Sequence, residues 1–354
     1  MKKLLFFALF CVLLISCKEK DILFRDVLSD FDVVVELSAP KTIIDNLLNP
    51  VHLSVCNSLI LFSEKTDSTT TVLYDTSGNH IINFLWKGRG PGETANTLDV
   101  SFYNDMIIQA SVHPERIFLY DINELLSGKK MPCGIHSLDA GDYASATILQ
   151  CDDDVLFYVG KDPKSKINDN RFCIRDIKRN ILYSFGRFPE EDIVISEFPE
   201  EDYSRQTAYQ GRPVLKPDHT KIVVPYYYAV GFDIVNRDER IVEYSNFYQY
   251  PGVECQYISQ IKATAVKRNE EKYRGFLDSC CSDESIYFLY SAKKLGDPGN
   301  VYGKYVLKYN WKGEPECCYI LDREVVNIAI DKNEKYLYVC FHDIEGGSIE
   351  RYSL

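Results

Sequence analysis

The sequence predicts an all-β protein, because one pattern recurs along most of its 354 residues. In each copy a polar turn with Asp or Asn precedes a β-branched and aromatic run, which is typical of a hairpin turn leading into a buried strand. The copies start at intervals of 47, 48, 66, 65 and 50 residues, at Asn57, Asn104, Asp152, Asp218, Asp283 and Asn333. These intervals are within or somewhat above the length of a four-stranded propeller blade. We therefore expect a six-bladed β-propeller.

Composition supports a folded protein and argues against some partners. Hydrophobic residues make up 45% of the chain and charged residues 26%, which is ample for a buried core. The formal net charge is −12, from 40 Lys and Arg against 52 Asp and Glu. With no basic tract to offset this charge, nucleic acid is excluded as an expected partner, and so is an anionic headgroup surface.

The N-terminus predicts export. Lys2 and Lys3 precede an unbroken apolar run from Leu4 to Ile15, which is too short to span a bilayer and typical of a secretory signal. The run ends in "LISC", and Leu14-Ile15-Ser16-Cys17 resembles the lipobox of bacterial lipoproteins, in which cleavage before the cysteine is followed by its acylation. The alternative is an ordinary signal peptide with a chance cysteine.

The lipobox resemblance implies three regions. Residues 1–16 are expected to be a lipoprotein signal peptide, residues 17–30 the lipidated Cys17 with its tether, and residues 31–354 one propeller domain. The acyl chains, palmitate among them, bind the membrane by hydrocarbon burial, so membrane contact is through the anchor only. The tetrad after Cys17, "KEKD", weakly resembles the signal that sends some Bacteroidota lipoproteins to the cell surface. An outer-membrane lipoprotein at the periplasmic face or the cell surface is thus expected.

Strand counting at the two ends predicts how the ring closes. The sixth blade has only "VVNIAID", "KYLYVCF" and "SIERYSL", so it lacks its outermost strand. The alternating "FDVVVEL" at residues 31–37 is expected to supply that strand by pairing with the last one, which leaves fewer sheet edges exposed. A stacked solenoid would not explain a spare strand at one end and a missing strand at the other.

Residues 86–94, "WKGRGPGET", concentrate glycine and proline. A phosphate-binding loop needs a lysine and a hydroxyl residue after its last glycine, whereas a carboxylate that repels phosphate follows here. The segment lies between the last strand of blade one and the first of blade two, where glycine permits positive φ and proline stiffens the reversal. We expect a structural loop formed by Gly88, Gly90, Pro91, Gly92 and Glu93.

The same loop carries a family resemblance. Its residues 88–93, "GRGPGE", resemble the "GxGPGE" segment of the TolB-like six-bladed β-propeller lipoproteins of Bacteroidota. That family is similar to NHL-repeat propellers. The likeness extends over the lipobox, a "P-x-x-I/L" segment at residues 50–53 and the six repeats. Thr94 stands where a phenylalanine commonly follows the glutamate. The resemblance implies the fold and an envelope location, and it implies little about chemistry.

Cysteine and histidine are placed for packing rather than for disulfides or metal. The doublets at residues 280–281 and 317–318 fall in the first and last strands of blade five, roughly 14 Å apart, which is beyond the reach of a disulfide. Cys56, Cys173 and Cys340 lie in apolar runs and are expected to pack as small hydrophobes. The six histidines are scattered, so we expect no metal coordinated by Cys or His, and no cofactor.

An acidic segment precedes blade four. "FPEED" occurs at residues 188–192 and again at residues 198–202, and its carboxylates could hold calcium through oxygen ligands. The spacing fits no loop that wraps a single ion, so a solvated acidic loop is the preferred interpretation.

A second segment, "YSRQTAYQGRP" at residues 203–213, is the candidate ligand site. It places Arg205, Tyr209 and Arg212 on a loop that enters the channel at blade four. Guanidinium forks and tyrosine rings suit an anionic or sugar-like ligand. The three tyrosines of "PYYYAVGF" that follow, at residues 226–228, are expected to pack between blades.

The sequence carries no catalytic motif. It has no serine nucleophile elbow, no "HExxH" and no pair of carboxylates marked as acid and base. The first hypothesis is a non-catalytic, lipid-anchored propeller that binds a protein, peptide or glycan ligand in the envelope. The alternative is a hydrolase or lyase with its active site at the channel mouth, which buried, convergent titratable groups there would favour.

The lipobox hypothesis predicts the behaviour of one variant. Acylation needs the thiol of Cys17, so Cys17→Ala should release the protein from the membrane fraction while its melting temperature stays unchanged. Fractionation of cells after a high-salt wash measures this. A variant that stays with the membranes would contradict the lipid anchor.

Overall fold

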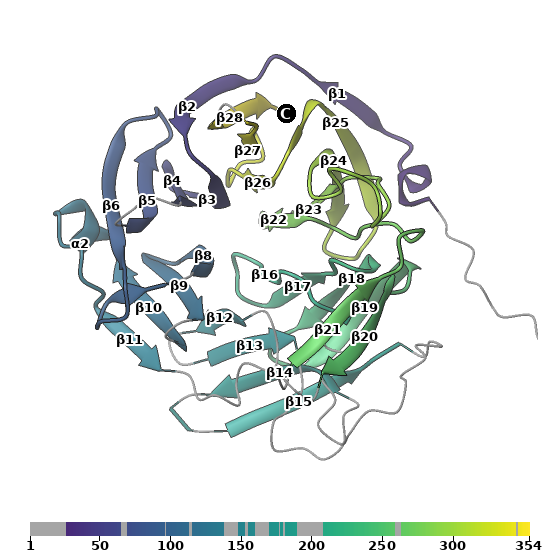
Figure 1. The fold of residues 1–354 in the computed structure, drawn as a ribbon, viewed down its shortest axis with the longest axis horizontal. Coiled ribbons are helices and arrows are strands. Elements are labelled where there is room, and N and C mark those ends of the chain that lie inside the picture. Colours follow the sequence, from purple (N-terminus) through teal and green to yellow (C-terminus); the bar gives the residue numbers. More distant parts are fainter. Residues whose placement is uncertain are drawn as a thin grey trace, which may run out of the picture.

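The computed structural model shows a ring of six β-sheets around a central channel (Figure 1). The residues described are 26–64, 69–95, 97–112, 115–137, 148–152, 155–159, 170–176, 178–179, 181–189, 208–258, 263–344 and 346–354. Within this part of the chain the sheets follow one another in sequence order, each with its first strand innermost. The six-bladed β-propeller expected from the sequence is confirmed.

The first three blades lie between residues 50 and 187. Blade one is β3 (Pro50–Cys56), β4 (Leu59–Glu64), β5 (Thr69–Asp75) and β6 (His80–Lys87), with the short β7 (Glu93–Thr94) added at its edge. Blade two is β8 (Thr97–Tyr103), β9 (Met106–Val112), β10 (Glu115–Asp121) and β11 (Gly134–Ser137), with the helix α2 (Ile122–Leu126) after β10. Blade three is β12 (Ile148–Asp152), β13 (Val155–Val159), β14 (Asn170–Asp176) and β15 (Ile181–Arg187).

The other three blades complete the ring. Blade four is β16 (Val214–Leu215), β17 (Lys221–Pro225), β18 (Val230–Asn236) and β19 (Ile241–Gln249), and a separate hairpin of β20 (Val253–Ile258) and β21 (Ala263–Arg268) follows it. Blade five is β22 (Asp278–Cys281), β23 (Ser285–Tyr290), β24 (Gly303–Asn310) and β25 (Pro315–Val325). Blade six is β26 (Asn327–Ile330), β27 (Tyr336–His342) and β28 (Gly347–Ser353). Three elements precede the blades: the 3-10 helix η1 (Val27–Asp30), β1 (Val34–Leu37) and β2 (Lys41–Leu47).

The core consists of apolar clusters between neighbouring blades. Side chains of a strand alternate between its two faces, so one strand contributes to two interfaces. In β23, Ile286 and Phe288 pack toward blade four, whereas Tyr287 and Leu289 pack toward blade six. All four are fully buried, and this burial explains the unbroken apolar run "SIYFLY".

Closure by an N-terminal strand is confirmed, but a different strand provides it. β2 pairs antiparallel with β28, with Ile44 opposite Ile349, and becomes the outermost strand of blade six. β1, which lies within the expected segment 31–37, instead pairs in parallel with β25 of blade five, with Val34 opposite Cys318. Figure 1 shows the two strands one after the other along the outer rim. The prediction that residues 31–37 complete blade six was wrong.

Burial explains why the alternating pattern was misleading. Val34 is 53% exposed, so the alternation in "FDVVVEL" does not mark a strand with one buried face. β2 buries Ile44 and Leu47, although its sequence contains Asp45 and Asn46, two residues that are typical of a turn. Asn46 has a φ of +56°, and the register with β28 shifts on both sides of Ile44, so β2 is a bulged strand.

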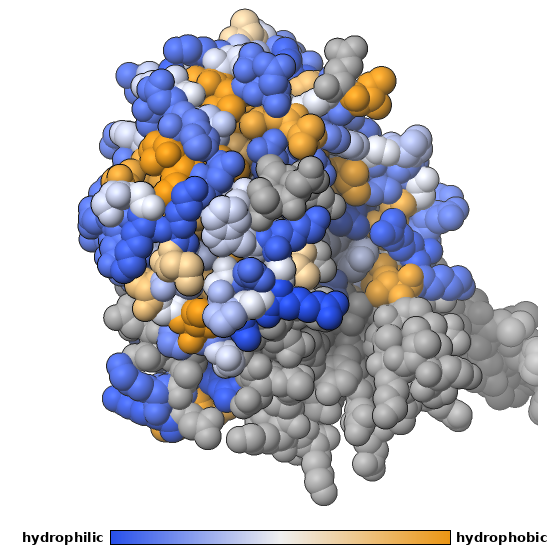
Figure 2. Space-filling view, turned by 60° about the vertical axis from the view of Figure 1, so that its left-hand side comes forward, coloured by the Kyte–Doolittle hydropathy of each residue, from blue (hydrophilic) through white to orange (hydrophobic). Residues whose placement is uncertain are grey.

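The rim of blades one and two carries exposed apolar side chains in separate places. They are Trp86, Leu126, Met131 and Ile135. Figure 2, which brings this side of the ring forward, shows apolar groups interrupted by hydrophilic ones. Scattered exposed apolar side chains of this kind are ordinary on protein surfaces. No helix in the described ranges is long and apolar enough to cross a membrane.

The closing strand predicts a contrast between two substitutions. Ile44 is 6% exposed in the cluster between blades six and one, so Ile44→Asp buries a charge and should lower the free energy of unfolding by about 3 kcal/mol or more. Val34→Asp, on exposed β1, should change it by less than about 0.5 kcal/mol. Urea denaturation compares the two. A larger loss from Val34→Asp would contradict β2 as the closing strand.

Candidate functional site

Polar side chains converge where the innermost strands begin. Successive strands of a blade run antiparallel, so the starts of all innermost strands lie at one end of the ring, here called the channel mouth. Asp278 and Asn327 are the first residues of β22 and β26, and His52 and Asp99 are the third residues of β3 and β8. Arg212 lies two residues before β16. Five blades thus each contribute one polar residue to the channel mouth.

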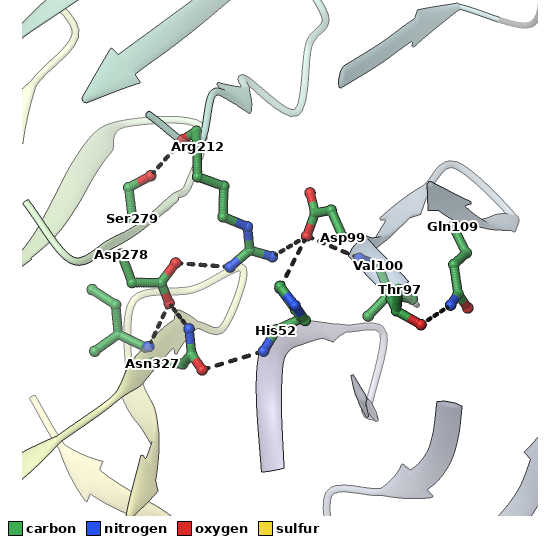
Figure 3. Close-up of polar contacts among 10 residues, drawn as sticks. His52, Thr97, Asp99, Val100, Gln109, Arg212, Asp278, Ser279 and Asn327 are labelled. Atoms are coloured by element: carbon green, nitrogen blue, oxygen red, sulfur yellow. Dashed lines mark hydrogen bonds and ion pairs between the residues drawn. The ribbon is translucent and has the colours of Figure 1, made fainter. Parts of the chain in front are cut away.

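The guanidinium of Arg212 links three blades. Its two terminal nitrogens lie 2.7 Å from Asp99 Oδ1 and 2.7 Å from Asp278 Oδ1, so it connects blade four to blades two and five (Figure 3). The Arg212 carbonyl accepts a hydrogen bond from Ser279 Oγ at 3.2 Å. Burial alone would lower the pKa of Arg212, but the charges of Asp99 and Asp278 outweigh this effect and raise it. Arg212 is therefore a permanent cation, and each of its two terminal nitrogens pairs with a carboxylate.

Asp278 is held on every side. Its side chain is fully buried, and its second oxygen, Oδ2, accepts hydrogen bonds from Asn327 Nδ2 at 3.0 Å and from the Ile328 amide at 2.9 Å. With Arg212 on Oδ1, this carboxylate has three donors, which is what a buried charge requires. Asn327 also accepts from the His52 amide at 3.2 Å and so joins blade six to blade one.

His52 and Asp99 form the more accessible part of the cluster. Their side chains are 25% and 15% exposed, and His52 Nδ1 lies 3.7 Å from Asp99 Oδ1, too far for a direct hydrogen bond. The same Asp99 oxygen accepts from the Val100 amide at 2.9 Å. Burial, followed by the charge of Arg212, lowers the pKa of His52, so the imidazole is neutral at neutral pH. With two carboxylates and one guanidinium, the cluster carries a net charge of −1.

The predicted ligand residues separate in the structure. Arg205 lies outside the described residues. Tyr209 is fully buried, with its ring centroid 5.3 Å from those of Phe188 and Tyr226, inside the core between blades three and four. Of the two members of the trio that the structure describes, Arg212 lies at the channel mouth and Tyr209 lies in the core.

The tyrosines at residues 226–228 divide in the same way. Tyr226 is fully buried, and its hydroxyl donates to Asp233, a buried carboxylate that Arg171 of blade three pairs with at 3.0 Å. Tyr227 and Tyr228 are half-buried, with their rings near the guanidinium of Arg274. Tyr226 therefore packs between blades, as expected, whereas Tyr227 and Tyr228 are partly exposed at the channel mouth.

Sequence reasoning missed five residues here, namely His52, Asp99, Asp278, Asn327 and Arg274. A signal for two of them was present: "LDVS" and "LDSC" place a Leu-Asp pair at the start of the innermost strands of blades two and five. A carboxylate at the start of an otherwise apolar strand indicates a channel-lining position. Arg274 has no comparable signal, because it lies in an irregular connection between β21 and β22.

The glycine-rich loop is organised around its own carboxylate. Glu93 Oε2 accepts from the Gly90 amide at 2.8 Å, and the Glu93 amide donates to the Gly90 carbonyl at 3.1 Å. A Cβ at Gly88 would lie 2.0 Å from Glu93 Oε2, and Gly92 has a φ of +76°, so side chains are disfavoured at both positions. Pro91 lies between these contacts, and the β7 edge pairs in parallel with β6. The geometry is that of a turn between two blades.

The described cysteines are all free thiols. The doublets at residues 280–281 and 317–318 lie in β22 and β25, which β23 and β24 separate. Cys173 and Cys340 are buried, whereas Cys56 is half-buried. The second "FPEED" and most of the first fall outside the described residues.

Comparison with one solved structure, with a TM-score above 0.5, supports the fold. The chain is similar to a protein from Bacteroides fragilis whose name describes it as exported, with 13% identity, a TM-score of 0.56, and coverage of 90% of this chain and 98% of that one. It is also similar to a β-propeller domain from Myceliophteria thermophila, with 10% identity, a TM-score of 0.46, and coverage of 89% and 100%. At these identities the likeness concerns the fold alone. No family model matches the sequence, nor does any curated protein, so membership of the TolB-like family of Bacteroidota stays a prediction.

The neutral imidazole predicts a pH dependence. The folded-state pKa of His52 is below its ordinary value of 6.5, so as the pH falls below about 6.5 the unfolded chain takes up this proton first and stability declines. His52→Gln should lose less stability than the unmodified protein between about pH 7.5 and 5.5, by at most about 1.4 kcal/mol per pH unit. Urea denaturation at both pH values measures the difference. An equal or larger loss in the variant would contradict a lowered pKa.

Proposed function

We propose that this protein is an exported, lipid-anchored β-propeller that binds a ligand of the cell envelope at its channel mouth without catalysing a reaction. Export and anchoring rest on the apolar run from Leu4 to Ile15 and on the lipobox that ends at Cys17. The similar fold of a protein described as exported agrees with this location. The envelope ligand is a protein, peptide or glycan.

One observation carries the binding proposal: three partly exposed polar side chains from three blades meet at the channel mouth. They are His52, Asp99 and Arg212, with side-chain exposures of 25%, 15% and 12%. Loops at the ends of propeller strands commonly hold ligands, because a rigid scaffold positions them. Arg212 spans the cluster, so the ligand is expected to rest on the mouth rather than to pass through the channel.

The occupied hydrogen-bonding groups favour binding over catalysis. Arg212 is engaged by two carboxylates and Asp278 by three donors, so neither is poised to exchange a proton. An anion would have to displace a carboxylate to reach Arg212. Asp99, by contrast, has an Oδ2 atom with no hydrogen-bond partner among the described residues, and this atom can accept a hydrogen bond from a hydroxyl or an amine.

A second candidate function, a hydrolase or lyase, is favoured by the His52–Asp99 pair. A neutral imidazole 3.7 Å from a carboxylate is suited to accept a proton, and burial lowers the pKa of that imidazole. A substrate that brings a hydroxyl or an acidic C–H bond between the two groups would meet a base and its orienting partner. A hydrolase or lyase of this kind needs the side chains of both His52 and Asp99.

Recovery of partners from native envelopes tests the proposal. His52→Gln and Asp99→Asn should each reduce recovery of the bound ligand by roughly tenfold relative to the unmodified lipoprotein, since each removes a polar contact. His80→Gln is the matched control, because His80 is exposed on outer strand β6 and bonds Asn83. Equal recovery with all three variants would contradict a site at the channel mouth.

The same experiment separates the two functions. The ligand recovered from the envelope is returned to the purified lipoprotein and followed by mass spectrometry. Release of the ligand unchanged in mass supports binding. Cleavage that disappears with His52→Gln and persists with His80→Gln would replace the binding proposal by the hydrolase or lyase.

A further inference from the structure

The connection that precedes blade five lies against the tyrosine turn of blade four. The amides of Gly275 and Phe276 donate to the carbonyls of Tyr227 and Tyr226, both at 2.9 Å. The Arg274 amide donates to the Lys293 carbonyl at 2.8 Å, in the turn after β23. These turns lie between the second and third strands of their blades, at the end of the ring that holds the channel mouth. Backbone contacts thus fix Arg274 beside the tyrosine turn.

The side chain of Arg274 rests on two tyrosine rings. Its guanidinium carbon lies 5.2 Å from the ring centroid of Tyr228 and 5.7 Å from that of Tyr227, within the range of cation–π contacts. Its Nε is buried and has no hydrogen-bond partner among the described residues, whereas the guanidinium as a whole is hydrogen-bonded to the side chain of Tyr228. The side chain of Arg274 thus contacts tyrosines and pairs with no carboxylate of the described chain.

Arg274 differs from two other arginines of the ring in its partners. Arg171 pairs with Asp233 and Arg212 pairs with Asp99 and Asp278, whereas no ion pair joins Arg274 to any carboxylate of the described chain. Burial, together with the positive charge of nearby Arg268, lowers the pKa of Arg274, while the charges of Asp99 and Asp278 raise that of Arg212. No carboxylate of the described residues therefore neutralises the positive charge of Arg274.

Tyr227 links Arg274 to the channel mouth. Its amide donates to the carbonyl of Gln210 at 2.8 Å, two residues before Arg212. Burial raises the pKa of Tyr227, and the charge of Arg212 opposes that shift, so the phenol is neutral and near both arginines. The tyrosine turn and the cluster at the channel mouth are therefore adjacent.

We propose that Arg274, Tyr227 and Tyr228 form a subsite for the carboxylate of an acidic sugar, in a glycan that extends over the channel mouth. This inference rests on the proposed binding function and names its ligand class. The guanidinium, which no carboxylate of the described residues neutralises, supplies donors for a carboxylate, and the tyrosine rings supply faces for a sugar ring.

The charge of the channel mouth selects among anionic ligands. The cluster of His52, Asp99, Arg212 and Asp278 carries a net charge of −1, so it repels a densely charged polyanion. Its accessible carboxylate accepts hydrogen bonds from hydroxyl groups, which sugars present in number. A ligand with one carboxylate at Arg274 and hydroxyl groups at Asp99 satisfies both places.

Titration calorimetry on the lipidated protein in detergent tests the subsite with three probes. The probes are a short neutral oligosaccharide that ends in a single glucuronic acid, the same oligosaccharide with that carboxyl group reduced to an alcohol, and a glutamate-rich peptide. We expect the charged oligosaccharide to bind roughly tenfold or more tightly than the reduced one. The peptide is expected to bind more weakly than the charged oligosaccharide, because it offers no sugar ring to Tyr228.

Two arginine variants make the test specific. Arg274→Gln should weaken binding of the charged oligosaccharide by roughly tenfold and leave the reduced one unchanged. Arg240→Gln is the matched control, because its guanidinium lies 3.4 Å from the ring centroid of Tyr183 at the other end of blade four. Tyr228→Leu should weaken both oligosaccharides, since stacking does not depend on charge.

Three results would overturn the inference. They are no binding of the charged oligosaccharide at about millimolar concentration, equal affinity of Arg274→Gln and Arg240→Gln for it, and tighter binding of the peptide. Failure of the binding function itself is separate: envelope recovery would then be insensitive to His52→Gln and Asp99→Asn. If those variants lose the ligand and Arg274→Gln retains it, the channel-mouth site stands and the acidic-sugar subsite is wrong.

Discussion

The pairing of β2 with β28 is the contact on which the ring depends. At the other interfaces, the packed strands belong to blades that follow one another directly in sequence. Blade six must meet blade one across nearly the whole chain, and the cluster between them combines Ile44 with Ile349 and Phe62. Closure also fixes the innermost strands around the channel, since an open ring would let blades two and five separate. Only at a fixed separation can one guanidinium reach both Asp99 and Asp278 at 2.7 Å.

Buried charges then set how neighbouring blades are placed. Isolation of a charged group from water is costly unless donors or counter-charges surround it. Asp278 meets this condition only when blades four, five and six are in place, because its partners are Arg212, Asn327 and the Ile328 amide. Arg171 and Asp233 play the same part between blades three and four. A shifted blade would leave a buried charge without its partner. These contacts therefore disfavour alternative packings more than they add to the net free energy of unfolding.

The sequence predicted the blades well because each blade repeats a local pattern, a polar turn before a β-branched and aromatic run. It misplaced the closing strand because burial, not alternation, distinguishes β2 from β1, and the bulge at Asn46 hides that burial. The site was harder still. His52, Asp99 and Asp278 are distant in sequence and converge only through the ring, whereas Arg212 was found because it lies on a loop with an unusual arginine and tyrosine content. Tyr209 shared that loop but is drawn into the core by its ring contacts.

Two arginines near one channel mouth have opposite electrostatic roles. Arg212 pairs with two carboxylates, so its charge holds the blades together. The cluster of the three residues has a net negative charge. Arg274 has aromatic faces in place of a carboxylate, so no carboxylate of the described residues compensates its charge. A ligand that covers both arginines therefore meets a positive charge at Arg274 and a net negative charge in the cluster around Arg212. This favours a molecule with a defined anionic end and a neutral, hydroxyl-rich body. Charge placement of this kind fixes the direction in which a ligand lies as well as its class, because reversal would set its carboxylate against Asp99.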